Sequence, residues 1–215
     1  MSLELKKRLF TSITLLFSLM IMFFSNLFFV FFLIIFLTLG IVEFLNLINK
    51  IHKNIFKKII SNTLFISYIF VLFSILLQFS VFYNLKIIIF TILLICISSD
   101  IGGYFFGKKF NGPKLTKISP NKTIAGSIGA LILSSLTSII TISYLINEIT
   151  LKSFLLGIII SFGVQVGDIF FSFLKRRARL KDTGNILPGH GGILDRIDGI
   201  IIGMPLGLIF FLMIH

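Results

Sequence analysis

The sequence contains few charged and few chemically reactive side chains for its length. Among 215 residues there are 8 acidic residues, 3 histidines, one cysteine and no tryptophan. The single cysteine, Cys96, excludes an intramolecular disulfide and a metal site made of several thiolates. Charged residues make up 13% of the chain and hydrophobic residues 56%, which is typical of a polytopic membrane protein rather than of a soluble domain.

Most of the charge that is present is positive. The 20 lysines and arginines give a formal net charge of +12, and they lie in short blocks between apolar runs. Such blocks bind anionic lipid headgroups and orient membrane helices. We therefore expect membrane lipids, and no nucleic acid, as partners.

Seven apolar segments are long enough to span, or nearly span, a bilayer, which takes about 20 helical residues. They lie at approximately residues 9–24, 27–49, 59–79, 87–107, 124–146, 151–174 and 197–214. They lack the alternation of barrel strands, so helices are expected. The sequence predicts an all-α, polytopic membrane protein with about seven transmembrane helices, the first of which is retained because no cleavage site follows it. We treat residues 1–215 as a single domain, with N-terminal helices in 1–85 and catalytic helices and loops in 86–215.

The distribution of lysine and arginine predicts the orientation of these helices. If the N-terminus is cytoplasmic, all of the 20 basic residues except Lys86 and Lys152 fall in cytoplasmic segments. This partition follows the positive-inside rule. We therefore expect a cytoplasmic N-terminus.

Several acidic residues lie in or beside the apolar segments. Glu43, Asp100 and Asp168 each precede a basic block by seven or eight residues, which places them roughly 10–12 Å from the cytoplasmic ends of their helices. Asp195 and Asp198 have the i, i+3 spacing that puts two carboxylates on one helix face. A charge left in lipid costs about 3 kcal/mol, so these acids should face the interior and share partners or a cation. Alternatively they pair with nearby lysines or reach the interface, and for Glu43 the two interpretations are equally favoured.

The chemistry of these acids favours Mg²⁺ as a cofactor. Carboxylates are hard ligands, and the scarcity of cysteine and histidine argues against zinc. Mg²⁺ in proteins commonly accompanies substrate phosphates.

Two polar loops have features that suit phosphate binding. In "SPNKT", residues 119–123, Lys122 and Thr123 stand where a helix is expected to begin, although an ordinary orientation signal with a helix cap would look the same. In "LPGHGGILDR", residues 187–196, three glycines allow the backbone to approach a ligand or to turn. His190 in that loop either donates to a phosphate or stabilises the turn.

The segment "SFLKRRARLKDTGNILPGHGGILDRID", residues 172–198, resembles the signature of the phosphatidate cytidylyltransferases, or CDP-diacylglycerol synthases. "SDIGGYFFGKKFNGPKLTKISPNKT" is similar to the upstream part of that family. The resemblance covers approximately residues 98–198, and the first 85 residues resemble the family only in hydropathy. Ile124 and Ala125 depart from an aromatic residue and a glutamate found in many members. The matching signature positions are Ser172, Lys175, Arg176, Lys181, Asp182, Pro188, His190, Gly191, Gly192, Asp195, Arg196 and Asp198.

The resemblance implies a nucleotidyltransferase that makes CDP-diacylglycerol and pyrophosphate from CTP and phosphatidate, with Mg²⁺ required. It implies the following roles. The metal ligands would be Asp168, Asp195 and Asp198, with Asp100 as a further ligand. The catalytic set would be these first three together with Lys181, Arg196 and His190. Substrate would be bound by Ser119, Lys122, Thr123, Lys175, Arg176, Asp182, Gly191 and Gly192.

The expected location follows from the substrates. CTP arrives from the cytoplasm and phosphatidate from the cytoplasmic leaflet, so we expect an active site on the cytoplasmic side of a bacterial inner membrane. A homodimer is left open. The alternatives are a cation transporter, a structural membrane subunit, a cytidylyltransferase for another lipid phosphate, and a CTP-dependent lipid kinase.

Overall fold

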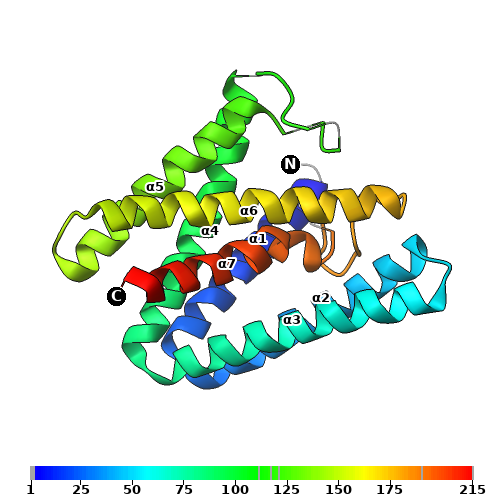
Figure 1. The fold of residues 1–215 in the computed structure, drawn as a ribbon, viewed down its shortest axis with the longest axis horizontal. Coiled ribbons are helices and arrows are strands. Elements are labelled where there is room, and N and C mark those ends of the chain that lie inside the picture. The colour runs from blue at the N-terminus through cyan, green and yellow to red at the C-terminus, as the bar shows by residue number, and fades with distance from the viewer. Residues whose placement is uncertain (1–2, 111, 117, 121, 190, 215) are drawn as a thin grey trace. The chain divides into compact units, whose positions relative to one another are not determined.

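The computed structural model describes residues 3–110, 112–116, 118–120, 122–189 and 191–214. Within these ranges the regular structure consists of seven helices and no strand, so the predicted all-α class is confirmed (Figure 1). The helices are α1 (Leu3–Phe24), α2 (Asn26–Ile51), α3 (Ile55–Val81), α4 (Tyr83–Phe110), α5 (Ile124–Ile146), α6 (Leu151–Arg177) and α7 (Leu194–Ile214).

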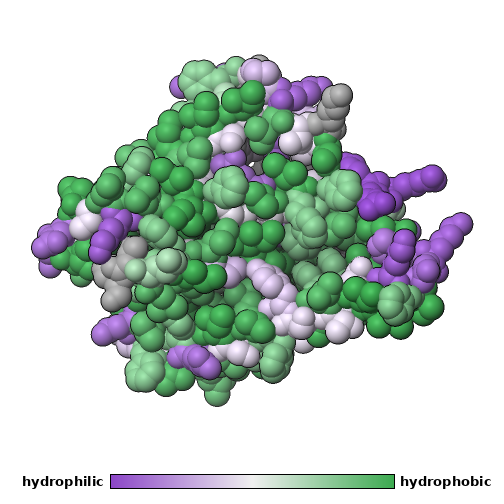
Figure 2. Space-filling model, viewed as in Figure 1, coloured by the Kyte–Doolittle hydropathy of each residue, from purple (hydrophilic) through white to green (hydrophobic). Residues whose placement is uncertain are grey.

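The predicted apolar segments all fall within these helices. In the described part of the chain, helices α2 to α7 are each long and apolar enough to cross a membrane, whereas α1 contributes the shorter apolar stretch Leu9–Phe24. Several helices extend beyond the predicted segments because polar residues continue the helical backbone past the apolar run. Figure 2 shows a face made largely of hydrophobic residues, as expected for a surface in contact with lipid. The chain is an integral membrane protein.

The chain forms two compact units that do not follow the order of the sequence. Unit 1 contains Met1–Lys86 and Leu174–Ile197, and unit 2 contains Ile87–Phe173 and Asp198–His215. Most of the signature segment therefore belongs to the unit of the N-terminal helices. The predicted single domain, divided near residue 85, stays a prediction.

Unit 1 is built around α2, which packs against both α1 and α3. Figure 1 shows α2 and α3 running side by side. The rings of Phe44 on α2 and Phe65 on α3 stack with their centroids 3.7 Å apart. The buried positions of α2 recur every three or four residues, as expected for one face of a helix. Glu43 is one of these buried positions.

Unit 2 is held together by close approaches of small residues. A Cβ atom at Gly102 of α4 would lie 2.5 Å from the carbonyl oxygen of Gly129 on α5. A Cβ atom at Gly163 of α6 would lie 2.8 Å from Cα of Gly203 on α7. Glycine at these positions lets the helix backbones touch, which is the usual way in which membrane helices gain packing energy.

Buried and partly buried polar side chains also link the helices of unit 2. Ser99 on α4 and Ser161 on α6 share a hydrogen bond of 2.8 Å. Gln165 donates from Nε2 to Ser161 Oγ over 3.2 Å, and its Oε1 accepts from Ser127 of α5. These groups satisfy one another within an apolar bundle, so α4, α5 and α6 are fixed in register.

Candidate active site

The signature segment begins with a sharp reversal at the end of α6. The N–H of Leu180 donates to the carbonyl of Lys175 over 2.9 Å, and the N–H of Arg179 donates to that of Arg176 over 3.0 Å. Arg179 takes the left-handed conformation, with φ of 56°. These two bonds form a Schellman motif, which normally uses glycine at this position. The turn directs the chain from α6 into the glycine-rich loop.

A second turn lies at the tip of this loop. The N–H of Leu187 donates to the carbonyl of Gly191 over 2.9 Å, and both Gly189 and Gly191 have positive φ, of 75° and 83°. A side chain at either glycine would be strained. Thr11 of α1 donates from its hydroxyl to the carbonyl of Pro188 over 2.8 Å, so the first helix also holds the turn. Contact of Gly191 with substrate stays a prediction.

Asp195, in the first turn of α7, is a hydrogen-bonding centre of unit 1. Its Oδ1 accepts from Lys175 Nζ over 2.8 Å, and the side chains of the pair are only 5% and 12% exposed, respectively. Its Oδ2 accepts from the backbone N–H of Thr183 over 2.8 Å and of Gly192 over 3.0 Å. Asp195 therefore joins the end of α6 to both ends of the glycine-rich loop. Two residues predicted to be in the site, Lys175 and Asp195, are in direct contact.

Glu43 of α2 binds the same loop from another side. Its side chain is buried, with 3% of the residue exposed. Oε2 accepts from Thr183 Oγ1 and from the N–H of Leu194, both over 2.8 Å, and Oε1 accepts from the N–H of Ile193 over 3.0 Å. Of the two interpretations of Glu43, the structure therefore supports an interior position with hydrogen-bond partners.

The glycines that flank the loop fit against these carboxylates. A Cβ atom at Gly184 would lie 2.5 Å from Glu43 Oε1, and one at Gly192 would overlap Thr183 Oγ1 and the Glu43 carboxylate. The N–H of Gly192 donates a hydrogen bond to Asp195. The absence of a side chain at Gly192 thus lets the loop backbone lie against the carboxylate of Glu43. Its predicted contact with substrate stays a prediction.

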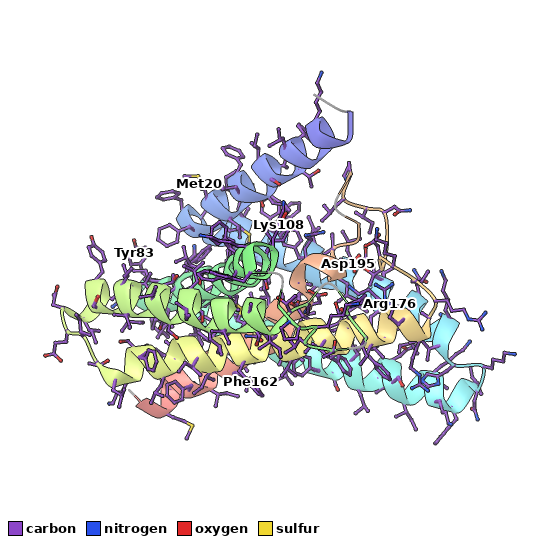
Figure 3. All side chains as sticks on the ribbon, turned by 90° about the horizontal axis from the view of Figure 1, so that it is seen from above. Met20, Tyr83, Lys108, Phe162, Arg176 and Asp195 are labelled. Carbon is purple, nitrogen blue, oxygen red and sulfur yellow. The ribbon has the colours of Figure 1, made fainter. Side chains whose placement is uncertain are left out.

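Exposed charged residues lie in the loop and beside it within unit 1. Arg176, Lys181, Asp182 and Arg196 are all exposed. Figure 3 labels Arg176 in the last turn of α6 and Asp195 in the first turn of α7. Arg176 also donates from Nη1 to the carbonyl of Leu180, with which it helps to close the turn after α6. Arg176, Lys181 and Arg196 place positive charge on this exposed surface. The predicted role of His190 concerns a residue outside the described ranges.

The second predicted loop belongs to unit 2 and leads into α5. Thr123 caps α5, because its hydroxyl accepts from the N–H of Gly126 over 3.1 Å. Ser119 accepts through its carbonyl from the N–H of Lys122 over 3.0 Å. The predicted helix start and cap are confirmed, and binding of a phosphate there stays a prediction.

Lys122 pairs with an acid that was predicted to bind metal. Its Nζ lies 2.7 Å from Oδ2 of Asp168 on α6, and the two side chains are 28% and 23% exposed. Asp168 also lies beside α7, because a Cβ atom at Gly199 would be 3.1 Å from Asp168 Oδ1. Asp198 stands next to that glycine, so the two acids lie on facing parts of α6 and α7. Asp100 of α4, which was expected to face the interior, is exposed because Ser99 and its neighbours take the buried face.

The acids have the donor chemistry that Mg²⁺ requires. Carboxylate oxygens are hard ligands, and Mg²⁺ is commonly bound through one or two carboxylates plus water and phosphate oxygens. Within the described ranges, no group of three or more histidine, cysteine, aspartate or glutamate side chains is placed to hold a metal. The predicted Mg²⁺ ion and its predicted ligands Asp168, Asp195 and Asp198 stay a prediction.

Two residues with clear structural roles were not predicted from the sequence. Thr183 and Thr11 lie in segments where nothing in the local pattern singles them out. Glu43 could be noticed by its unusual depth in an apolar helix, but its partners lie 140 to 151 residues away in the chain. Only the tertiary structure brings them together.

Known proteins resemble about half of the chain. A phosphatidate cytidylyltransferase of Bacillus subtilis is 41% identical over 120 residues, covering 54% of this chain and 43% of that protein. One of Helicobacter pylori is 40% identical over 121 residues, covering 54% and 44%. One of Staphylococcus haemolyticus is 44% identical over 110 residues, covering 50% and 42%. The match thus spans less than half the length of each relative.

The family model of the cytidylyltransferases covers far more of the chain, because it matches residues 4–214. This range includes the N-terminal helices, whose sequence resembles the family only in hydropathy. The resemblance drawn from residues 172–198 is confirmed, and the chain belongs to the cytidylyltransferase family.

Proposed function

We propose that the chain transfers a cytidylyl group from CTP to phosphatidate and releases pyrophosphate. Family membership and the names of the relatives support this reaction. The structural observation that carries the proposal is the loop of residues 180–193. The buried carboxylates of Asp195 and Glu43 hold this loop at Thr183 and at residues 192–194, and exposed cations lie in the loop and beside it. This is the arrangement expected of a rigid site for phosphates.

The reaction needs positioning and charge neutralisation more than it needs a strong base. A phosphatidate oxygen attacks the α-phosphorus of CTP, the new P–O bond forms as the bond to the β-phosphate bridge breaks, and pyrophosphate leaves. The second pKa of a phosphomonoester is about 6, so the nucleophile is already largely ionised at neutral pH. Effective catalysis then comes from holding both substrates in line and stabilising the charge on the phosphates.

The cations of the site have different tasks in this proposal. Arg176, Lys181 and Arg196 are exposed and would bind phosphate oxygens, for which guanidinium groups offer paired donors. Lys175 is held by Asp195 and would present a fixed positive charge beside the loop. Lys122 would do the same from the loop before α5, where Asp168 orients it.

Mg²⁺ is the proposed cofactor, and Asp168, Asp195 and Asp198 would hold it, with Asp100 as a further acid. When bound, the ion neutralises charge on the phosphates of CTP. The donor set supports this assignment, since hard oxygen ligands suit Mg²⁺ and the signature supplies no thiolates.

The proposed setting is a bacterial inner membrane with the site on the cytoplasmic side. The apolar helices and the distribution of lysine and arginine support this topology. CTP would enter from the cytoplasm and phosphatidate from the adjoining leaflet. Association into a homodimer remains open within this proposal.

The test is a product analysis with the purified full chain in mixed micelles containing phosphatidate, CTP and Mg²⁺. We expect equimolar CDP-diacylglycerol and pyrophosphate, and no product when Mg²⁺ is chelated. The variant Glu148→Gln, at an exposed position between α5 and α6, is the matched control and should retain the wild-type rate. Formation of CDP without a CDP-lipid would instead identify a lipid kinase. Cation flux into proteoliposomes without CTP would indicate a transporter.

A further inference from the structure

Glu43 lies outside the signature segment and takes no part in the mechanism above. It is nevertheless among the most constrained side chains of unit 1. Its carboxylate is buried in α2 and accepts three hydrogen bonds, all from residues 183–194. Such a group in an apolar helix is costly unless its partners are well placed, so its contacts reveal what it does.

The first contact is with the start of α7. Residue Ile193 occupies the N-cap position of this helix and has no side-chain acceptor, so it cannot cap the helix itself. Glu43 instead accepts from the N–H groups of Ile193 and Leu194. A negative charge at a helix N-terminus is also favoured by the helix dipole. Glu43 is therefore a cap supplied by a different helix.

The second contact reaches the other end of the loop. Thr183 donates its hydroxyl to Glu43 and its N–H to Asp195. Asp195 in turn accepts from the N–H of Gly192, next to the residues that Glu43 caps. Two carboxylates thus hold the same two ends of one loop. A shift of Glu43 would move Thr183 and the start of α7, and with them the carboxylate of Asp195.

We propose that Glu43 is a positioning residue for the transfer reaction, because it holds residues 183–194 in the geometry in which Asp195 and the loop act on the substrates. The kinetic part of this inference rests on the proposed function. Its structural part, that Glu43 restrains the loop, does not.

A carboxylate is required at this position because all three partners are donors. Glutamine has nearly the same shape but offers one oxygen and one NH₂ group. In Glu43→Gln the NH₂ group would face the N–H of either Ile193 or Leu194, which leaves a buried donor without an acceptor. Glu43→Asp keeps both oxygens on a shorter side chain, so it should restore part of the function. A greater loss of function in Glu43→Gln than in Glu43→Asp would show that the carboxylate, and not the size of the side chain, is required.

The first measurement is hydrogen exchange of the full chain in micelles. In Glu43→Gln we expect the amides of residues 183–194 to exchange at least about tenfold faster, whereas amides of α5, in unit 2, keep their wild-type rates. Glu148→Gln removes a charge at an exposed site and should change neither region. Unchanged exchange in residues 183–194 of Glu43→Gln would overturn the inference, whatever the activity.

The second measurement is steady-state kinetics with each substrate varied. Glu43→Gln should lower kcat at least about tenfold with a smaller change in KM, since positioning in the transition state is lost, and Glu43→Asp should recover part of kcat. Thr183→Val removes one of the three bonds and tests the same link if Glu43→Gln does not fold, while Thr183→Ser should restore it. A wild-type kcat in a variant whose loop exchanges faster would refute a positioning role.

Coupling between the two residues completes the test. If Glu43 acts through Thr183, the double variant Glu43→Gln/Thr183→Val should lose little more than Glu43→Gln alone, and strictly additive losses would contradict the link. Absence of CDP-diacylglycerol synthesis by the wild-type chain would refute the proposed function and with it the kinetic part. In that case, the exchange measurement still decides whether Glu43 restrains the loop.

Discussion

Replacing Lys175 by methionine should destabilise the protein far more than the same replacement of Lys122. Each lysine pairs with one aspartate at nearly the same distance, 2.8 Å for Lys175 and Asp195 and 2.7 Å for Lys122 and Asp168. The two pairs differ in burial. The side chains are 12% and 5% exposed in the first pair and 28% and 23% exposed in the second.

The expected magnitudes follow from this difference. Removing one partner of a buried ion pair leaves the other charge uncompensated and costs about 3–5 kcal/mol. Asp195 keeps two backbone N–H donors after the change, so we expect a loss near the lower limit, about 3 kcal/mol. The Lys122–Asp168 pair is less buried, and exposed ion pairs contribute about 1 kcal/mol or less, which sets the expected loss for Lys122→Met.

The assay is equilibrium unfolding of the purified chain by titration of sodium dodecyl sulfate into mild micelles, followed by circular dichroism. Lys175→Met, Lys122→Met and the double variant Lys175→Met/Asp195→Asn would be compared with the wild type. The double variant should lose less than the sum of its single changes, because neither charge is left alone.

Equal losses in the two lysine variants would refute the reasoning, because burial would then not govern the strength of these pairs. A loss in the double variant equal to the sum would show that Lys175 and Asp195 do not interact energetically. Activity is not needed for this test, so it stands independently of the proposed reaction.

Three further predictions concern other parts of the site. Lys122→Ala should lower kcat/KM by at least about tenfold, roughly 1.4 kcal/mol, in micelle kinetics. Lys114→Ala, at an exposed position of the same loop, should change kcat/KM little. Equal small effects of the two variants would make the loop only an orientation signal. Gly192→Ala should lower the thermal midpoint, since its Cβ would overlap the Glu43 carboxylate, and an unchanged midpoint would contradict that contact. In a cysteine-free background, a cysteine replacing exposed Asn185 should react with an impermeant maleimide only from the cytoplasm, and one replacing Glu148 only from outside; the reverse would invert the topology.

Hydropathy was sufficient to locate the helices, because a bilayer requires long apolar segments with satisfied backbone groups. The ends of the helices were less predictable. α4 runs from Tyr83 to Phe110, beyond the predicted residues 87–107, since a helix continues through polar residues that hydropathy excludes. The predicted cap at Thr123 was correct because a cap depends on neighbouring residues alone.

The internal bonding of the site was only partly accessible from the sequence. Lys175 and Asp195 both belong to one recognisable segment, and the structure joins them directly. Their pairing, like that of Lys122 with Asp168, depends on the path of the chain between them. The same is true of Gly192, whose close neighbour is Glu43 from a distant helix. Sequence spacing contains no signal for such contacts.

The discontinuous composition of unit 1 has a consequence for how the protein is made. Glu43 enters the membrane with α2, but its first partner, Thr183, follows 140 residues later. At about 5–20 residues per second, the ribosome needs roughly 7–28 s to produce that interval. During this time the nascent chain holds an acidic group in an apolar helix before its native donors exist. The hydrogen bonds of Glu43 cannot be completed until residues 183–194 have been synthesised, so unit 1 reaches its final structure only late in synthesis of the chain.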